Sequence, residues 1–157
     1  MTRATLRLIT SCGIVAAAAG CSSTKPTTAA SPAGHVMPEF VVPSQGTNPF
    51  SAVVRVGNLL FVAGQLGTDA NGLVKGGIGP ETTAALQNIS NVLKRAGSSM
   101  DRVAKCTVMM QDMSKWAEMN AAYIAFFPGP KPARSSFGAT ALALGGHVEI
   151  ECIATVD

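Results

Sequence analysis

From Phe40 to the end of the chain, short apolar stretches alternate with glycine and proline, and this pattern restricts the fold more than any other feature. Residues 53–56 and 59–63 are apolar runs separated by Gly57 and Asn58, which predicts a β-hairpin. A helix is expected to begin at residues 79–81, with proline in its first position and glutamate in its first turn, and to end before Gly97. Its apolar residues share one stripe that should cover a core: Ala85, Ile89, Val92, Leu93 and Ala96.

A third strand and a second helix are predicted next. Residues 102–110 alternate as a strand, with one apolar face made of Cys106, Val108 and Met110. Ser114 is a candidate N-cap for the second helix, which the Pro-Gly-Pro sequence at 128–130 should end. Three of its side chains recur at helical spacing: Met119, Tyr123 and Phe126. We expect this helix to pack on the same core.

Two further strands are expected at residues 131–138 and 147–156, joined by a glycine-rich turn. The order β-β-α-β-α-β-β predicts an α+β fold with one mixed sheet and two helices on one face. In the last strand, Val148 and alternate residues after it should face the helices, while Glu149 and Glu151 face the other way. Apolar hairpin residues on that far face favour self-association.

The first twenty residues are typical of an export signal. Arg3 and Arg7 precede an apolar run at 8–19 that is too short to span a bilayer. The run ends in Ala-Ala-Gly before Cys21, a sequence that looks like a lipoprotein cleavage box. Acyl chains on Cys21 would anchor the protein in the bacterial periplasm, and Ser22 favours the outer membrane. An ordinary signal peptide and a misassigned start codon are the alternatives.

Residues 21–39 are predicted to form a lipidated, disordered tether, because serine, threonine, alanine and proline dominate them. The globular domain is predicted to span residues 40–157. The chain has 12 basic and 9 acidic residues, and removal of Arg3 and Arg7 with the signal leaves 10 against 9, a net charge of +1. That balance does not indicate a nucleic-acid partner.

Cys106 and Cys152 would be the two cysteines of the predicted domain. An oxidising periplasm would permit a disulfide between them. Both fall on the helix-facing side of their strands, where a free thiol behaves as a small apolar side chain. We therefore expect two buried free thiols.

Arg134 and Glu149 stand out because the C-terminal region around them is otherwise apolar. A guanidinium on a rigid strand offers a planar fork for a substrate carboxylate, and a glutamate can move a proton or activate water. The pair suggests chemistry on a small carboxylate-bearing molecule. A surface ion-pair partner and a solvated sheet face are the structural alternatives for the two residues.

Residues 48–156 resemble the Rid family, the reactive-intermediate deaminases also called YjgF-type proteins. The resemblance is carried, in the family's order, by Asn48-Pro49-Phe50-Ser51, Gly57-Asn58, Phe61-Val62-Ala63-Gly64-Gln65, Ala96-Gly97-Ser98-Ser99, Asn120-Ala121-Ala122-Tyr123, Pro132-Ala133-Arg134-Ser135 and Val148-Glu149-Ile150-Glu151. It implies a chorismate-mutase-like fold and a homotrimer with ligand clefts between subunits.

The resemblance also implies the activity and its residues. Arg134 would grip the substrate carboxylate and Glu149 would activate water, while Gly64 and Asn120 would line the cleft. The implied reaction is hydrolysis of a 2-imino or 2-enamino acid to a 2-keto acid and ammonia. It needs no metal and no organic cofactor, because the C=N carbon is already electrophilic.

The chain departs from the family pattern at two substrate-binding positions, Phe50 in place of tyrosine and Ser136 in place of cysteine. Phe50 cannot donate a hydrogen bond, so a non-catalytic binding module for small carboxylates or amines is the alternative function. Ribonuclease activity, attributed to some family members, is disfavoured by the near-neutral charge. His147 is the single histidine of the predicted domain, and we expect it to bind no metal.

Overall fold

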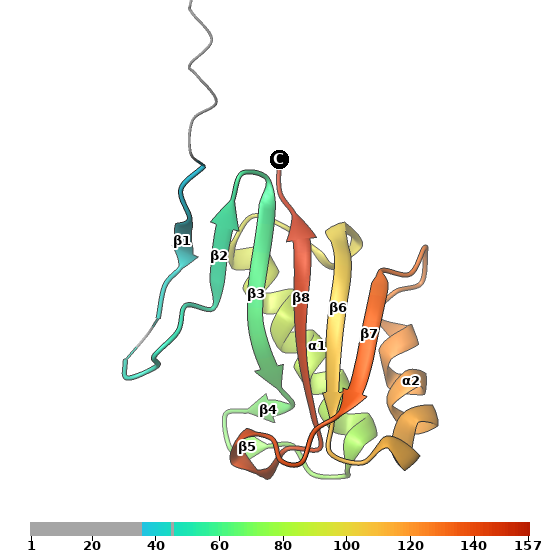
Figure 1. Ribbon diagram of the computed structural model, residues 1–157. Coiled ribbons are helices and arrows are strands. Elements are labelled where there is room, and N and C mark those ends of the chain that lie inside the picture. Colours follow the sequence, from blue (N-terminus) through green and yellow to red (C-terminus); the bar gives the residue numbers. More distant parts are fainter. Residues whose placement is uncertain (1–35, 45) are drawn as a thin grey trace, which may run out of the picture. The chain divides into compact units, whose positions relative to one another are not determined.

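The computed structural model describes residues 36–44 and 46–157, and the predicted signal peptide, Cys21 and most of the predicted tether lie outside these residues. A six-stranded sheet runs in the order β1-β2-β3-β8-β6-β7 (Figure 1). All neighbouring strands pair antiparallel except β6 and β7, which are parallel. The strands are β1 (Glu39–Val42), β2 (Val53–Val56), β3 (Leu59–Leu66), β6 (Val103–Met110), β7 (Ala133–Gly138) and β8 (Val148–Thr155).

Both helices, α1 (Ile78–Arg95) and α2 (Trp116–Ala125), lie on one face of the sheet, behind it in Figure 1. The predicted α+β class, with one mixed sheet and two helices, is confirmed. Two features were not predicted: the edge strand β1, which begins inside the expected tether, and a small hairpin of β4 (Thr68–Asp69) and β5 (Gly72–Leu73). Short 3-10 turns lie at Met100–Arg102, Met113–Lys115 and Ala143–Gly145.

The core lies between α1 and the sheet. Ala85, Ile89 and Leu93 of the predicted apolar stripe are fully buried. In β8, side chains alternate as expected, with Val148 and Ile150 buried and Glu149 and Glu151 facing away from the helices. Burial of each such aliphatic side chain stabilises the fold by about 1.5–3 kcal/mol. Apolar contact with the sheet therefore accounts for the position of α1.

The start of α2 differs from the prediction. A 3-10 turn at Met113–Lys115 precedes the helix, and the carboxylate of Asp112 accepts a hydrogen bond from the backbone N–H of Ser114 at 2.8 Å. Ser114 therefore donates the capping bond through its backbone N–H, and the prediction that its side chain caps α2 was wrong. Asp112 caps the 3-10 turn, and α2 itself begins after Lys115 with no side-chain cap.

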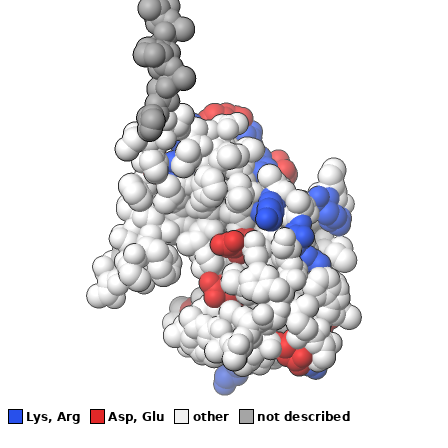
Figure 2. All heavy atoms as spheres, in the orientation of Figure 1, with Lys and Arg blue, Asp and Glu red and all other residues white. Residues whose placement is uncertain are grey.

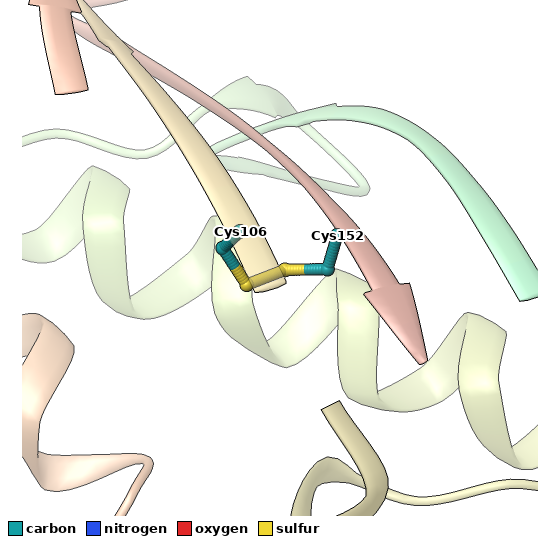
Figure 3. Close-up of a disulfide and its surroundings, with 2 residues drawn as sticks. All are labelled: Cys106 and Cys152. Atoms are coloured by element: carbon teal, nitrogen blue, oxygen red, sulfur yellow. A yellow bond between two sulfur atoms is a disulfide. The ribbon is translucent and has the colours of Figure 1, made fainter. Parts of the chain in front are cut away.

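Cys106 of β6 and Cys152 of β8 form a disulfide, so the prediction of free thiols was wrong (Figure 3). The two residues face each other in direct register across the antiparallel pair, with their Cα atoms 4.1 Å apart. Both are almost completely buried beneath α1, on the helix-facing side as expected. Their register depends on long-range strand pairing, which residue spacing alone cannot provide.

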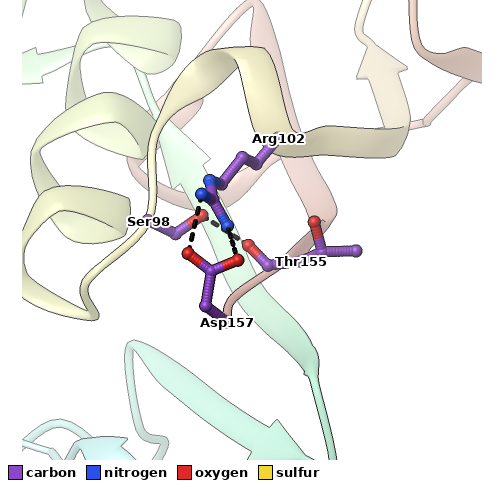
Figure 4. A network of polar contacts seen from close by, with 4 residues as sticks. All are labelled: Ser98, Arg102, Thr155 and Asp157. Carbon is purple, nitrogen blue, oxygen red and sulfur yellow. Dashed lines mark hydrogen bonds and ion pairs between the residues drawn. The ribbon is translucent and has the colours of Figure 1, made fainter.

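Polar contacts anchor the C-terminal end of β8 (Figure 4). Arg102 forms two bonds with the carboxylate of Asp157, at 2.6 and 2.8 Å. The hydroxyl of Ser98 donates to the carbonyl of Thr155 at 2.7 Å. The hydrogen bond from Arg102 lowers the pKa of Asp157. These bonds join the turn after α1 to the last residues of the chain.

The other face of the sheet carries no helix and is partly apolar. Phe61 is 42% exposed and Phe137 is 50% exposed, and both point to this face with Val54 and Ile153. The hairpin side of this face is largely uncharged in Figure 2. The predicted apolar far face is therefore present. Within the described part of the chain, no helix is both long and apolar enough to cross a bilayer.

Candidate functional site

Glu149 projects from β8 on the uncovered face, against the backbone of β3. Its register partners are Leu66 and Met109. A Cβ atom added at Gly64 would lie 2.0 Å from the carboxylate oxygen Oε1 of Glu149, a separation that real side chains do not reach. Gly64 lies at the irregularity in the β3–β8 pairing between Val62 and Gln65. The absence of a side chain there makes room for the carboxylate.

A cavity of about 480 Å³ contains this carboxylate, and we call it the glutamate half-site. It brings together three predicted site residues, Phe50, Gly64 and Glu149. Arg95 and Leu144 also line it, and the sequence interpretation missed both. Leu144 is 75% exposed and has a positive φ of 58°, which is uncommon for a bulky residue and typical of functional sites. No hydrogen bond links the Glu149 carboxylate to another residue that the structure describes.

Arg134 lies on the opposite face of the sheet. Its register partner in β6 is Cys106, whose side chain is in the core, so the guanidinium points toward α2. It donates to the amide oxygen of Asn120 at 2.7 Å. Its Cζ atom lies 4.6 Å from the ring centroid of Tyr123 and 5.1 Å from that of Trp116. Both aromatic contacts are cation–π interactions, which hold the guanidinium in one place.

A second cavity, of about 350 Å³, lies between α2 and the start of β7, and we call it the arginine half-site. Its lining residues are Asn120, Tyr123, Ile124, Lys131, Pro132 and Arg134. The sequence interpretation predicted Asn120 and Arg134 here. It missed the aromatic ring of Tyr123 and the ammonium of Lys131, although both lie close to predicted residues in the sequence.

Ser136 follows Arg134 on the same face of β7, in register with the core residue Val108. Its hydroxyl is buried without a hydrogen-bond partner in the described chain, and so is the hydroxyl of Tyr123. Burial raises the pKa of Tyr123, an effect that the positive charge of Arg134 partly offsets. The phenol is therefore a protonated donor at neutral pH. Unpartnered buried hydroxyls are costly, so a group from outside the described chain is expected to satisfy them.

The two half-sites do not meet within one chain. Glu149 is in register with Met109, which is also in register with Phe137, and all three face away from the helices. Arg134 faces the helices. One sheet thus separates the guanidinium from the carboxylate, and the two half-sites are not joined within one chain. That clefts between subunits bring Arg134 and Glu149 together stays a prediction.

His147 belongs to neither half-site. Its Nδ1 lies 2.5 Å from Oε1 of Glu81, and its backbone N–H donates to the other oxygen of the same carboxylate at 2.7 Å. Glu81 is only 2% exposed, in the first turn of α1. The pair connects the helix to the start of β8. Among residues 36–44 and 46–157, no group of three metal-ligating side chains is found.

Comparisons with known proteins agree on the family. The sequence profile described as Endoribonuclease L-PSP matches residues 43–156. The 2-iminobutanoate/2-iminopropanoate deaminase of Bos taurus is 42% identical over 108 residues, which cover 68% of this chain and 79% of that protein.

Two solved structures share the fold. RidA from the Antarctic bacterium Psychrobacter sp. has 32% identity and a TM-score of 0.67, with 74% of this chain and 95% of that one covered. E. coli TdcF with bound serine has 25% identity and a TM-score of 0.67, with 76% and 97% covered. The fold and the sequence thus point to the same group of proteins.

Proposed function

The chain belongs to the Endoribonuclease L-PSP family, also known as the Rid or YjgF-type family, and on that premise we propose that it hydrolyses 2-imino and 2-enamino acids. The products are a 2-keto acid and ammonia. One observation carries the proposal: the chain holds an arginine and a glutamate in two separate cavities, and neither has an ion-pair partner among the described residues. Relatives named 2-iminobutanoate/2-iminopropanoate deaminase support the same reaction class.

Arg134 binds the substrate carboxylate in this proposal. The hydrogen bond to Asn120 and the two aromatic rings orient the guanidinium, so that its remaining N–H groups are free to form a bidentate pair. Serine bound to the related TdcF is itself a small carboxylate. The Ser136 hydroxyl lies on the same side of β7 and supplies a further polar contact.

Glu149 acts as the base. It takes a proton from water as the water oxygen adds to the C=N carbon of the protonated imine, and the C=N electron pair moves to nitrogen to give a neutral tetrahedral carbinolamine. Glu149 returns this proton to the amine and then accepts the hydroxyl proton as the C=O bond forms, while the C–N bond breaks and ammonia leaves with its electron pair. Gly64 permits this chemistry because it leaves the carboxylate uncovered.

We further propose that the site forms between the subunits of a homotrimer. The guanidinium of one subunit and the carboxylate of its neighbour would then line one cleft. The apolar far face, with Phe61 and Phe137 exposed, offers a surface for that association. Three equivalent clefts would follow from the symmetry.

Export with a lipid on Cys21 is our proposal for the location, in the periplasm at the outer membrane. The Cys106–Cys152 disulfide supports an oxidising compartment, because disulfides persist in the periplasm and are rare in the bacterial cytosol. This support is independent of the N-terminal sequence. Lipidation itself rests on that sequence alone.

A binding module without turnover is the second candidate, and Phe50 favours it. Its ring lies in the glutamate half-site and is 54% exposed, yet it has no hydroxyl to position water or substrate. Under this reading, the cleft would hold small carboxylates or amines. RNA cleavage is not proposed, because the predicted mature chain is nearly neutral.

The deciding experiment measures keto-acid release by the full-length wild type and by Glu149→Gln from an enzymatically generated imino acid. Glutamine keeps the shape but not the basicity, so turnover should fall roughly 10²- to 10⁴-fold while the affinity for 2-ketobutyrate is retained. A wild-type rate equal to spontaneous hydrolysis, with 2-ketobutyrate still bound, would move the chain to the binding class.

A further inference from the structure

The arginine half-site holds two positive charges and no negative one. Arg134 and Lys131 both line the cavity of about 350 Å³, and its other lining residues are uncharged. Within residues 36–44 and 46–157, the two ion pairs are Arg102–Asp157 and His147–Glu81, so neither of the cavity's cations has an acidic partner. A partly enclosed cavity with this charge attracts anions.

The ammonium of Lys131 is held in position by the backbone. It donates one hydrogen bond to the carbonyl of Phe127 and a second, of 2.9 Å, to the carbonyl of Gly129. An ammonium has three donors, so one remains available. The carbonyl of Phe127 lies just beyond the end of α2, and lysine near a helix end often serves only as such a cap.

Capping alone does not account for the position of Lys131 beside Arg134. Two like charges that share one cavity repel each other, and a ligand with a single carboxylate would neutralise only one of them. The same cavity is also lined by Ile124, Pro132 and the ring of Tyr123, which suit a short carbon chain. The cavity thus combines two cations with an apolar wall.

We propose that the substrates include 2-imino dicarboxylates, 2-imino acids that carry a second carboxylate at the end of a short side chain. Arg134 binds the carboxylate next to the imine, and Lys131 binds the distal one. This inference rests on the proposed function, and the reaction at the imine carbon is unchanged. Lys131 is then a specificity-determining residue.

The test compares two stable keto acids, 2-ketobutyrate and 2-oxoglutarate, by titration calorimetry on the full-length protein. The wild type should bind 2-oxoglutarate about tenfold more tightly, as expected for one added charge-assisted hydrogen bond. Lys131→Met should abolish that preference, so that the two keto acids bind with equal affinity. Lys131→Arg keeps the charge and should keep the preference, and so should the control Lys94→Met on the last turn of α1.

Three outcomes would overturn the inference in different ways. Equal wild-type affinities for the two keto acids would refute the dicarboxylate specificity and leave the carboxylate contact of Arg134 intact. A preference that survives in folded Lys131→Met would show that another residue binds the distal carboxylate. Failure of the wild type to bind either keto acid would refute the proposed function together with the inference.

Discussion

The two half-sites differ in how the chain builds them. The arginine half-site comes from one continuous stretch, residues 120–134, in which a helix and the following strand place Asn120, Lys131 and Arg134 together. The glutamate half-site combines residues 42–68 with Val92, Arg95 and residues near 143–149. One is local in sequence, and the other depends on the long-range pairing of β3 with β8.

Their functional side chains differ in the same way. Arg134 is held by a hydrogen bond and two aromatic rings, whereas Glu149 has an open approach and no hydrogen bond to another described residue. A rigid cation suits recognition of a carboxylate. A less constrained carboxylate suits proton transfer. Under the proposed function, the half-sites would divide binding and chemistry between Arg134 and Glu149, which face opposite sides of the sheet.

The largest expected effect is the recovery of activity when subunits with different substitutions are mixed. Arg134→Ala and Glu149→Gln should each be inactive alone, yet co-expressed subunits should regain activity, because mixed trimers contain clefts with both intact residues. Every mixed cyclic trimer has one intact cleft, so mixed trimers should show roughly a third of the wild-type activity. Keto-acid release by subunits co-purified through two different tags, which removes the homotrimers, measures this. No recovery in mixed trimers would contradict a site shared between subunits.

Gly64→Ala should disable the glutamate half-site selectively. The added methyl would lie 2.0 Å from Oε1 of Glu149, so the flexible end of that side chain has to move. Turnover should fall roughly 10²- to 10⁴-fold, the range for loss of a positioned base, while the unfolding temperature stays near that of the wild type. Gly129→Ala is the matched control, because a methyl group added there would meet no atom within 4 Å. Wild-type turnover in Gly64→Ala would contradict the role of Glu149.

The disulfide should stabilise the sheet that carries both half-sites. It joins β6 to β8 across a sequence separation of 46 residues, and loop-closure entropy predicts a contribution of about 4 kcal/mol to the free energy of unfolding. Guanidinium titration with and without dithiothreitol measures the difference, and thiol labelling under denaturing conditions verifies the bond. If the unfolding curves with and without dithiothreitol are identical, and if thiol labelling is the same before and after reduction, the two cysteines are free.

The smallest expected effect lies at the C-terminal salt bridge. The hydrogen bond from Arg102 lowers the pKa of Asp157, so the stabilisation is present above the pKa of an unfolded aspartate, about 3.9, and is lost as the pH falls through the folded value. The unfolding temperature of Asp157→Asn should therefore be slightly below that of the wild type at pH 7. This difference in unfolding temperature should disappear in acid, and ligand affinity should not change. A difference that grows as the pH falls would contradict the prediction.

Much of the fold was predictable because it depends on local periodicity. The apolar stripe of α1 and the alternation of β8 determine which faces are buried, and both predictions were confirmed. The edge strand β1 was missed because its four residues carry no strong alternation, and three of them are exposed. Ser114 was wrongly expected to cap α2 because the short 3-10 turn that precedes the helix has little sequence signal.

The sequence by itself determined the order of the two helices and of the five strands β2, β3, β6, β7 and β8, the family and the chemical identity of the predicted site residues. Only the tertiary structure decided which of these residues meet. Strand register places Cys106 opposite Cys152, although free thiols were expected. The same register places Arg134 and Glu149 on opposite faces of the sheet. The physical reason is that side-chain direction follows a two-residue period within a strand, whereas contact across strands depends on pairing between distant segments.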